Sequence, residues 1–137
     1  MESEKNGLSG YQVEGLSHVL LQVSDLKVAE HFYCEIVGLS VKSRGNLKDN
    51  RPLLVTHQGI GLTLASSSPP RVAQIENRNM EHIAFWVMNI DSLVHRLRNH
   101  GIEPNGPVLN EYGQSLWVRD PDGNRVEFIE KREMDRF

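Results

Sequence analysis

The chain has 137 residues, of which 39% are hydrophobic and 24% are charged, the size and composition of one globular domain. The net charge is −3 and the basic residues are scattered, which argues against nucleic acid or an anionic membrane as a partner. No apolar run reaches the ~18 residues of a membrane-spanning helix. The polar segment 1–7 lacks the apolar stretch of a secretory signal, and Cys34 is the single cysteine. We therefore expect a cytoplasmic protein without intrachain disulfides.

The first half of the chain reads as one strand, one helix and three further strands. After a predicted tail at residues 1–13, residues 16–23 are rich in Val and Leu, which is typical of a strand. Asp25 is placed to cap a helix, and Gly38 is placed to end it. The pattern then predicts strands at residues 39–44, 52–57 and 60–65.

The second half repeats this order after a linker. Residues 66–79 contain Ser-Ser-Ser-Pro-Pro and little apolar periodicity, which is typical of a connecting segment. A strand at 81–88 precedes a helix that Asn89 or Asp91 caps and Gly101 ends. Further strands are predicted near 108–109, at 114–119 and at 124–130, the last two joined by a tight turn, Asp-Pro-Asp-Gly-Asn.

An offset of 64 residues relates the two halves. His18 opens the first strand of one half, and His82 opens the first strand of the other. At the last strand of each half, Thr63 occupies the position that Glu127 occupies in the repeat. A period of this length favours an internal duplication, because repeats that stack into an array are shorter.

This repeat predicts an α+β fold. Neither half can easily bury its apolar face alone, so we expect two paired βαβββ modules that form a curved mixed sheet, a cup with the helices outside. The predicted boundaries are a single domain at residues 14–131 with modules at 14–66 and 80–131, and a C-terminal tail at 132–137.

The alternation of side chains along the strands indicates a metal site inside the cup. It places His18 and Gln22 on the face opposite the aliphatic residues of the first strand. Most strand histidines are ordinary core or surface residues, but here both lie at matching positions. Two histidines and a carboxylate that face one cavity form a 2-His-1-carboxylate triad, so we predict that His18, His82 and Glu127 bind one divalent ion, Fe, Mn, Ni, Co or Zn. Other residues on the inner strand faces would line a substrate pocket: Gln22, Thr63, Trp86, Ser115 and Trp117.

The chain resembles the vicinal oxygen chelate superfamily, which includes glyoxalase I, bleomycin-resistance proteins, fosfomycin-resistance enzymes, methylmalonyl-CoA epimerase and extradiol dioxygenases. The resemblance covers roughly residues 14–131. It implies a metal-dependent enzyme that acts on a small substrate chelated through adjacent oxygens, and a homodimer, because two chains commonly complete the cups in these families. The segments that carry it are Leu16-Ser17-His18-Val19, Val23-Ser24-Asp25-Leu26, Phe32-Tyr33, Val37-Gly38-Leu39, Glu81-His82-Ile83-Ala84-Phe85, Asp120-Pro121-Asp122-Gly123-Asn124 and Val126-Glu127-Phe128.

The residues that decide the reaction differ among these families. Thr63 stands where glyoxalase I has a second Glu, and Trp117 stands where extradiol dioxygenases place a Tyr. Ser115 matches a Ser of the fosfomycin-resistance enzymes, but Pro107 lies near the place of their lysine-bearing loop. The resemblance therefore leaves lyase, isomerase, transferase and ring-cleaving dioxygenase chemistry open. The alternative is a metal-free binding or sequestering protein of the bleomycin-resistance type.

Overall fold

The computed structural model describes residues 10–44, 52–57, 59, 61–66 and 82–132. Nearly all of the predicted linker and most of both predicted tails lie outside these residues. The described strands form two four-stranded sheets. The first has the order β1-β4-β3-β2, with bounds β1 His18–Val23, β2 Ser40–Ser43, β3 Leu53–Val55 and β4 Gly61–Ser66. The second has the order β5-β8-β7-β6, with bounds β5 Ile83–Trp86, β6 Asn105–Asn110, β7 Gly113–Arg119 and β8 Arg125–Lys131.

The two sheets share the register that the repeat predicts. In the first sheet Leu20 lies opposite Thr63, and in the second Ala84 lies opposite Glu127, 64 positions further on at both places. In each module the strand that comes first in the chain pairs in parallel with the strand that comes last, β1 with β4 and β5 with β8. The other strand pairs run antiparallel. The sequence repeat is thus a repeat of geometry, and the α+β fold with two βαβββ modules is confirmed.

The first helix begins at the predicted cap and ends in a wider turn. The Asp25 carboxylate accepts hydrogen bonds from the backbone N–H groups of Lys27 and Val28, at 2.9 and 3.2 Å. Helix α2, Leu26–Glu30, continues as the π-helix η1, His31–Ile36. A bond from the Val37 N–H to the Phe32 carbonyl, five residues back, produces this wider turn. Gly38 then adopts a φ of 101° and ends the helix as predicted.

Two side chains cap the second helix, α3 Ile90–Asn99. Asn89 accepts a hydrogen bond from the Ser92 N–H at 3.3 Å, so the cap is Asn89 and not Asp91. The Glu130 carboxylate of β8 accepts a bond from the Ile90 N–H at 2.9 Å. This contact ties the start of α3 to its own sheet, where a carboxylate also suits the positive end of the helix dipole. Gly101, with a φ of 75°, follows the last turn.

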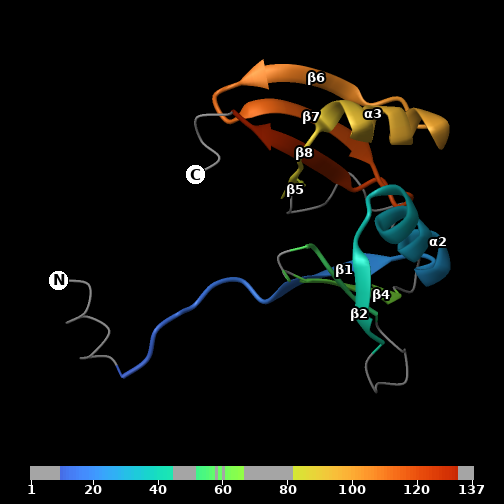
Figure 1. Ribbon diagram of the computed structural model, residues 1–137. Coiled ribbons are helices and arrows are strands. Elements are labelled where there is room, and N and C mark those ends of the chain that lie inside the picture. The colour runs from blue at the N-terminus through green and yellow to red at the C-terminus, as the bar shows by residue number, and fades with distance from the viewer. Residues whose placement is uncertain (1–9, 45–51, 58, 60, 67–81, 133–137) are drawn as a thin grey trace.

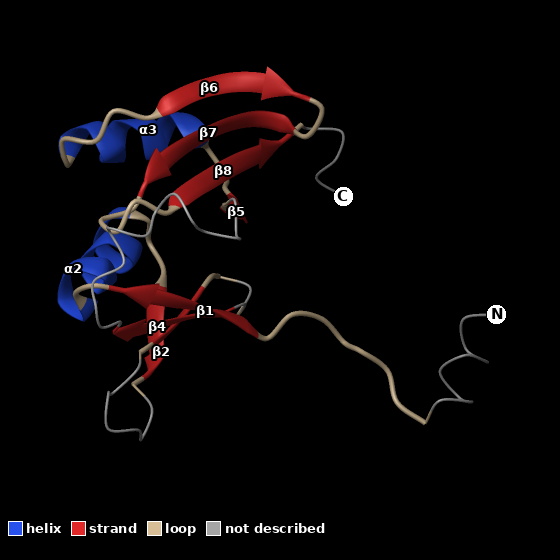
Figure 2. Ribbon diagram, turned by 180° about the vertical axis from the view of Figure 1, so that it is seen from behind, coloured by secondary structure: helices blue, strands red, loops and turns tan. Residues whose placement is uncertain are grey.

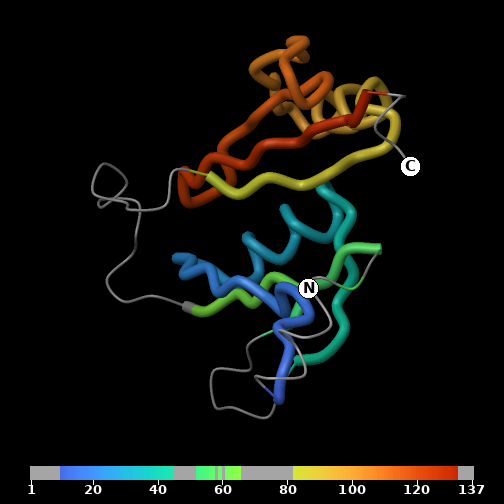
Figure 3. The backbone as a smooth tube through the Cα atoms, turned by 90° about the vertical axis from the view of Figure 1, so that its left-hand side faces the viewer, coloured from blue at the N-terminus to red at the C-terminus, as the bar shows by residue number. Residues whose placement is uncertain are grey.

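The helices cover the aliphatic faces of the sheets and form one core. Its buried members come from both modules: Leu21, Val23, Ala29, Phe32, Tyr33, Ile36, Leu39, Leu54, Leu62, Leu64, Ile90, Leu93, Leu97, Leu116, Val118, Val126 and Phe128. The sheets lie one above the other in Figure 1, and the first helix lies between them in all three views (Figures 1, 2 and 3). In the described residues no strand of one sheet pairs with a strand of the other, so the single curved sheet expected from the sequence is two sheets here.

Polar contacts of the β7–β8 turn fasten the two modules together. The Tyr33 hydroxyl of η1 donates to the Asp120 carboxylate at 2.6 Å, and both groups are buried. After β1, the backbone N–H and hydroxyl of Ser24 donate to Asp122 at 2.9 and 2.5 Å. The guanidinium of Arg96 in α3 donates to the carbonyls of residues 35 and 36 at the end of η1. This interface between helix and turn explains why the helix lies between the sheets. None of the described helices is long and apolar enough to cross a membrane.

Candidate functional site

The second sheet brings His82 and Glu127 together. His82 directly precedes β5, Glu127 lies in the neighbouring strand β8, and Nε2 of the imidazole is 3.3 Å from Oε1 of the carboxylate. The side chains are 37% and 20% exposed, so a ligand from solvent can reach both. Parallel pairing of β5 with β8 produces this approach, because it fixes Ala84 opposite Glu127 and so places His82 at the same end of the pair.

The spacing of these two atoms fits two ligands of one metal ion. Metal–nitrogen and metal–oxygen bonds of about 2.0 to 2.2 Å place adjacent ligand atoms about 2.8 to 3.1 Å apart at octahedral angles and about 3.3 to 3.6 Å apart at tetrahedral angles. The observed 3.3 Å matches the tetrahedral spacing. A direct hydrogen bond would also bring the two groups this close. The imidazole nitrogen and the carboxylate oxygen are, however, also donor types that a divalent transition metal prefers, and solvent reaches both side chains.

The third predicted ligand belongs to the other sheet. His18 is exposed at the start of β1, where its Nδ1 lies 3.0 Å from the Ser17 hydroxyl. In the part of the chain that the structure describes, no three His, Cys, Asp or Glu side chains lie close enough to hold a metal ion. The two sheets are not joined edge to edge, so one chain supplies the pair His82 and Glu127 but not the triad. Binding of a metal by all three residues stays a prediction.

The predicted pocket residues divide between the two sheets. Gln22 and Thr63 lie on the same face of the first sheet as His18; Gln22 is exposed and Thr63 is half-buried. The strand register aligns the other three with Glu127 on one face of the second sheet. Trp117 lies opposite Glu127, while Trp86 and Ser115 both lie opposite Ile129, two residues further along β8. Trp86 is 57% exposed, whereas Ser115 is buried and accepts a hydrogen bond from the Asn110 amide at 2.7 Å.

Three cations on this face were not predicted as site residues. The guanidinium groups of Arg119 and Arg125 lie 5.1 and 4.5 Å from the centre of the Trp117 ring. The Lys131 ammonium lies 4.6 Å from the centre of the Trp86 ring. The signal for them was the period of two in β8, which places Arg125 and Lys131 on the face of Glu127.

The single cysteine lies away from the candidate site. Burial raises the pKa of the Cys34 thiol, and the nearby carboxylates of Glu30 and Glu35 raise it further. A thiol with a raised pKa is a poor nucleophile, since the thiolate is the reactive form. Cys34 packs against the core from η1, which fits a structural role.

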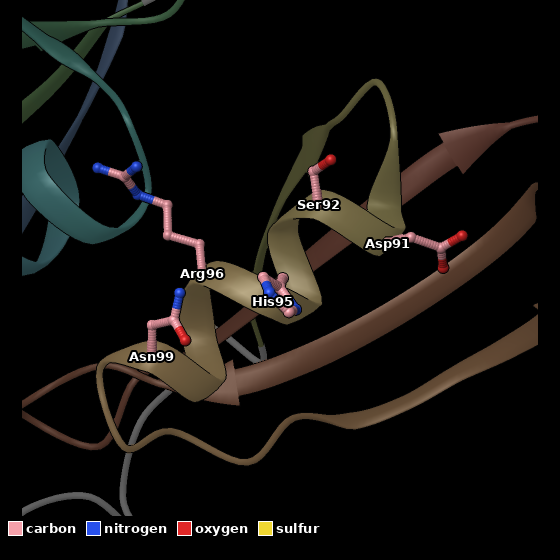
Figure 4. Close-up of a pocket in the computed structure, with 5 residues that line it drawn as sticks. All are labelled: Asp91, Ser92, His95, Arg96 and Asn99. Carbon is pink, nitrogen blue, oxygen red and sulfur yellow. The ribbon is translucent and has the colours of Figure 1, made fainter.

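A shallow depression on the outer surface of α3 does not contribute to the site. Its lining comes from one helix only, and Figure 4 shows Arg96 extending from it toward the first module. That side chain already binds the backbone at the end of η1. The lining residues are Asp91, Ser92, His95, Arg96 and Asn99. The candidate site therefore remains the sheet faces that carry His18, His82 and Glu127.

The site and the repeated modules agree with a family match. The model of the Glyoxalase/Bleomycin resistance protein/Dioxygenase superfamily matches residues 15–128. The chain belongs to this superfamily. A solved structure from Frankia sp. EAN1pec, described as a glyoxylase/bleomycin resistance protein/dioxygenase domain, has a TM-score of 0.76 and 24% identity, covering 88% of this chain and 100% of that one. This likeness shows the fold of the superfamily.

Two relatives carry different reactions in their names. Biphenyl-2,3-diol 1,2-dioxygenase 3 of Rhodococcus globerulus is 30% identical over 123 residues, which cover 82% of this chain but only 60% of the dioxygenase. Glutathione transferase FosA of Serratia marcescens is 27% identical over 117 residues, which cover 84% of this chain and 79% of the transferase. Superfamily membership is therefore clear, and it does not by itself select a reaction.

Proposed function

We propose that the superfamily member described here is a divalent-metal-dependent enzyme whose small substrate chelates the metal through adjacent oxygens. The observation that carries the proposal is the 3.3 Å approach of His82 Nε2 to Glu127 Oε1 on one face of the second sheet. The imidazole nitrogen and the carboxylate oxygen would supply two of the three protein ligands of an Fe, Mn, Ni, Co or Zn ion, and His18 would supply the third.

Each residue has a distinct role in this proposal. His82 and His18 would each supply an imidazole nitrogen to the ion. Glu127 offsets part of the 2+ charge. The bound ion would polarise substrate oxygens or lower the pKa of a bound water. The indoles of Trp86 and Trp117 provide flat apolar walls beside it, and Thr63 of the first sheet could orient a water.

The reaction class depends on the metal. Iron favours oxygenation of the kind that the dioxygenase relative is named for, whereas Mn, Ni, Co or Zn favours lyase, isomerase or transferase chemistry. One relative is named a dioxygenase and the other a transferase, so the names do not decide between these classes. The proposal is therefore metal-assisted chemistry on vicinal oxygens, with the metal as the first property to identify.

A second copy of the chain would supply the missing histidine. Contacts between the η1 helix and the β7–β8 turn keep the two sheets of one chain apart, while β1 and β5 each have an unpaired outer edge in the described residues. A homodimer in which β1 of one copy lies beside β5 of the other would bring His18 to His82 and Glu127 and cover these edges. A cytoplasmic location remains a prediction from composition.

Metal analysis of the purified protein tests the proposal. We expect about one divalent ion per chain in the wild type and binding weaker by about 100-fold or more in Glu127→Gln, because even indirect partners of metal ligands change affinity by 10- to 100-fold. Glu103→Gln is the matched control, since Glu103 pairs with Arg98 on the outer surface and should leave metal content unchanged. Equal metal content in wild type and Glu127→Gln would contradict the metal site. Ligand binding by a wild type that takes up no metal would instead indicate the binding protein.

A further inference from the structure

Two histidines outside the candidate site meet where the helices of the two modules contact each other. His31 is the first residue of η1 in the first module, and His100 follows the last residue of α3 in the second module. The centres of the two imidazole rings are 6.1 Å apart, and the ring planes make an angle of 71°. Both residues are exposed, so an ion from solvent can reach both rings.

Other contacts between the modules fix where these two histidines lie. Four residues before His100 in α3, the Arg96 guanidinium donates to backbone carbonyls at the end of η1. The same helix η1 is held by the buried hydrogen bond from the Tyr33 hydroxyl to the Asp120 carboxylate of the second module. The approach of His31 to His100 thus joins two anchored helices and does not depend on a loop or a terminus.

The separation of the two rings suits two ligands of one transition-metal ion. A zinc–nitrogen bond of about 2.0 to 2.1 Å puts the ion about 3.2 Å from the centre of the imidazole, since the nitrogen lies about 1.1 Å from that centre. Two rings bound to one ion then have centres about 5.2 Å apart at a tetrahedral angle and about 6.4 Å apart when they lie on opposite sides of the ion. The observed 6.1 Å lies between these values.

Rotation of the two rings converts their present contact into a metal site. The rings now meet edge to face. The Cβ–Cγ bond of a histidine points almost at the ring centre, so rotation about χ2 turns the nitrogens while the centre hardly moves. This torsion is broad and roughly two-fold, so an exposed histidine can adopt several ring orientations. His31 and His100 can therefore each direct one nitrogen toward a point between the rings.

We propose that His31 and His100 form a second metal site, at which a Zn, Cu or Ni ion clamps the two modules together. Imidazole nitrogen is a ligand that these ions prefer, and water fills the other coordination positions. No group of three His, Cys, Asp or Glu side chains in the described residues could hold an ion, so the protein supplies two ligands at this contact. Because the two ligands come from different modules, the ion stabilises the folded chain.

Two ligands make this site weak. Since a structural zinc site has four ligands, half of them should supply roughly half of its binding free energy, which corresponds to a Kd for Zn²⁺ on the order of 10 µM. An ion held this weakly is removed by dialysis. The metal content of the purified protein therefore still reports the proposed centre at His82 and Glu127.

Zinc titration of four proteins tests the second site. All four carry His82→Gln and Glu127→Gln, which remove two ligands of the proposed metal centre, so the outcome does not depend on that centre. One protein has no other change, and the others add His31→Gln, His100→Gln or His95→Gln. His95 is the matched control, because it is an exposed histidine of the same helix that lines the shallow depression on its outer surface.

We expect calorimetry to show one Zn²⁺ per chain in the protein without a further change and in His95→Gln. His31→Gln and His100→Gln should each bind at least about 10-fold more weakly, because even indirect partners of metal ligands change affinity by 10- to 100-fold. Zinc at about 1 mM should raise the melting temperature of the first two proteins by about 5 °C and that of the last two by less than about 2 °C. The proposal is overturned unless His31→Gln and His100→Gln both weaken zinc binding more than His95→Gln does.

Discussion

At the scale of single residues, the strongest constraints are buried polar contacts between the modules. Asp120 is buried, and its carboxylate accepts bonds from the Tyr33 hydroxyl, the backbone N–H groups of residues 122 and 124, and the amide of Asn124. A buried carboxylate loses its hydration on folding, so these donors are needed to compensate it. The Asp-Pro-Asp-Gly-Asn turn thus has two functions: it joins β7 to β8 and binds the helix of the other module.

Tyr33→Phe tests the contact between modules. Removing the hydroxyl takes one donor from a buried carboxylate, which should lower the free energy of unfolding by about 1 to 3 kcal/mol. Tyr112→Phe, at an exposed position, should change it by less than about 0.5 kcal/mol. Urea denaturation of the three proteins measures the difference. A Tyr33→Phe protein as stable as wild type would show that the bond to Asp120 adds nothing to the interface.

At the scale of elements, much of the fold could be predicted from the sequence because local signals and the repeat agree. Asp25 and Gly38 mark the ends of the first helical segment, and the offset of 64 predicted which strands occupy equivalent places. The π-turn of η1 was not predicted, since the apolar spacing of a single wide turn differs little from that of an α-helix. Strand β6 is longer than the predicted residues 108–109, because backbone pairing with β7 continues through residues without a clear apolar pattern.

An ion pair links α2 to the residue after β2 and gives a pH-dependent prediction. Two bonds from the Arg44 guanidinium to the Glu30 carboxylate, the shorter of 2.6 Å, lower the pKa of Glu30. A lowered folded pKa means that the pair stabilises the protein above the unfolded pKa of about 4.3 and that this contribution is lost as the pH falls through the folded value. Because solvent reaches both side chains, the contribution of the pair at pH 7 should be small.

Comparing Glu30→Gln with wild type at two pH values measures this effect. At pH 7 the melting temperature of the variant should be slightly lower, and the difference should shrink as the pH falls below the ordinary pKa of a glutamate. A difference that grows on acidification would contradict the sign of the pKa shift.

At the scale of the whole molecule, the described part of the chain brings together two of the three predicted ligands, His82 and Glu127. The approach of His82 to Glu127 agrees with the sequence prediction, because parallel pairing of β5 with β8 follows from the module itself. The position of His18 relative to that pair could not be predicted. Its strand has the same pattern whether the two modules close a cup within one chain or with a second copy, and the contacts that decide, such as Tyr33 with Asp120, are distant in sequence. The cations near Trp86 and Trp117 were missed for a different reason. The period of two in β8 places Arg125 and Lys131 on the face of Glu127, but only the strand register shows that the two tryptophans lie beside them.

The proposed metal centre is formed by His82 and Glu127 of one copy and His18 of another, and mixing two variants that each lack a ligand tests it most directly. His18→Ala and Glu127→Gln should each bind little metal alone. Unfolded and refolded together, they form mixed dimers in which one of the two sites has all three native ligands, so metal content should return to about a quarter of the wild-type value. Light scattering should give the refolded mixture the mass of a dimer. A mixture that binds no more metal than the separate variants would contradict a site shared between copies.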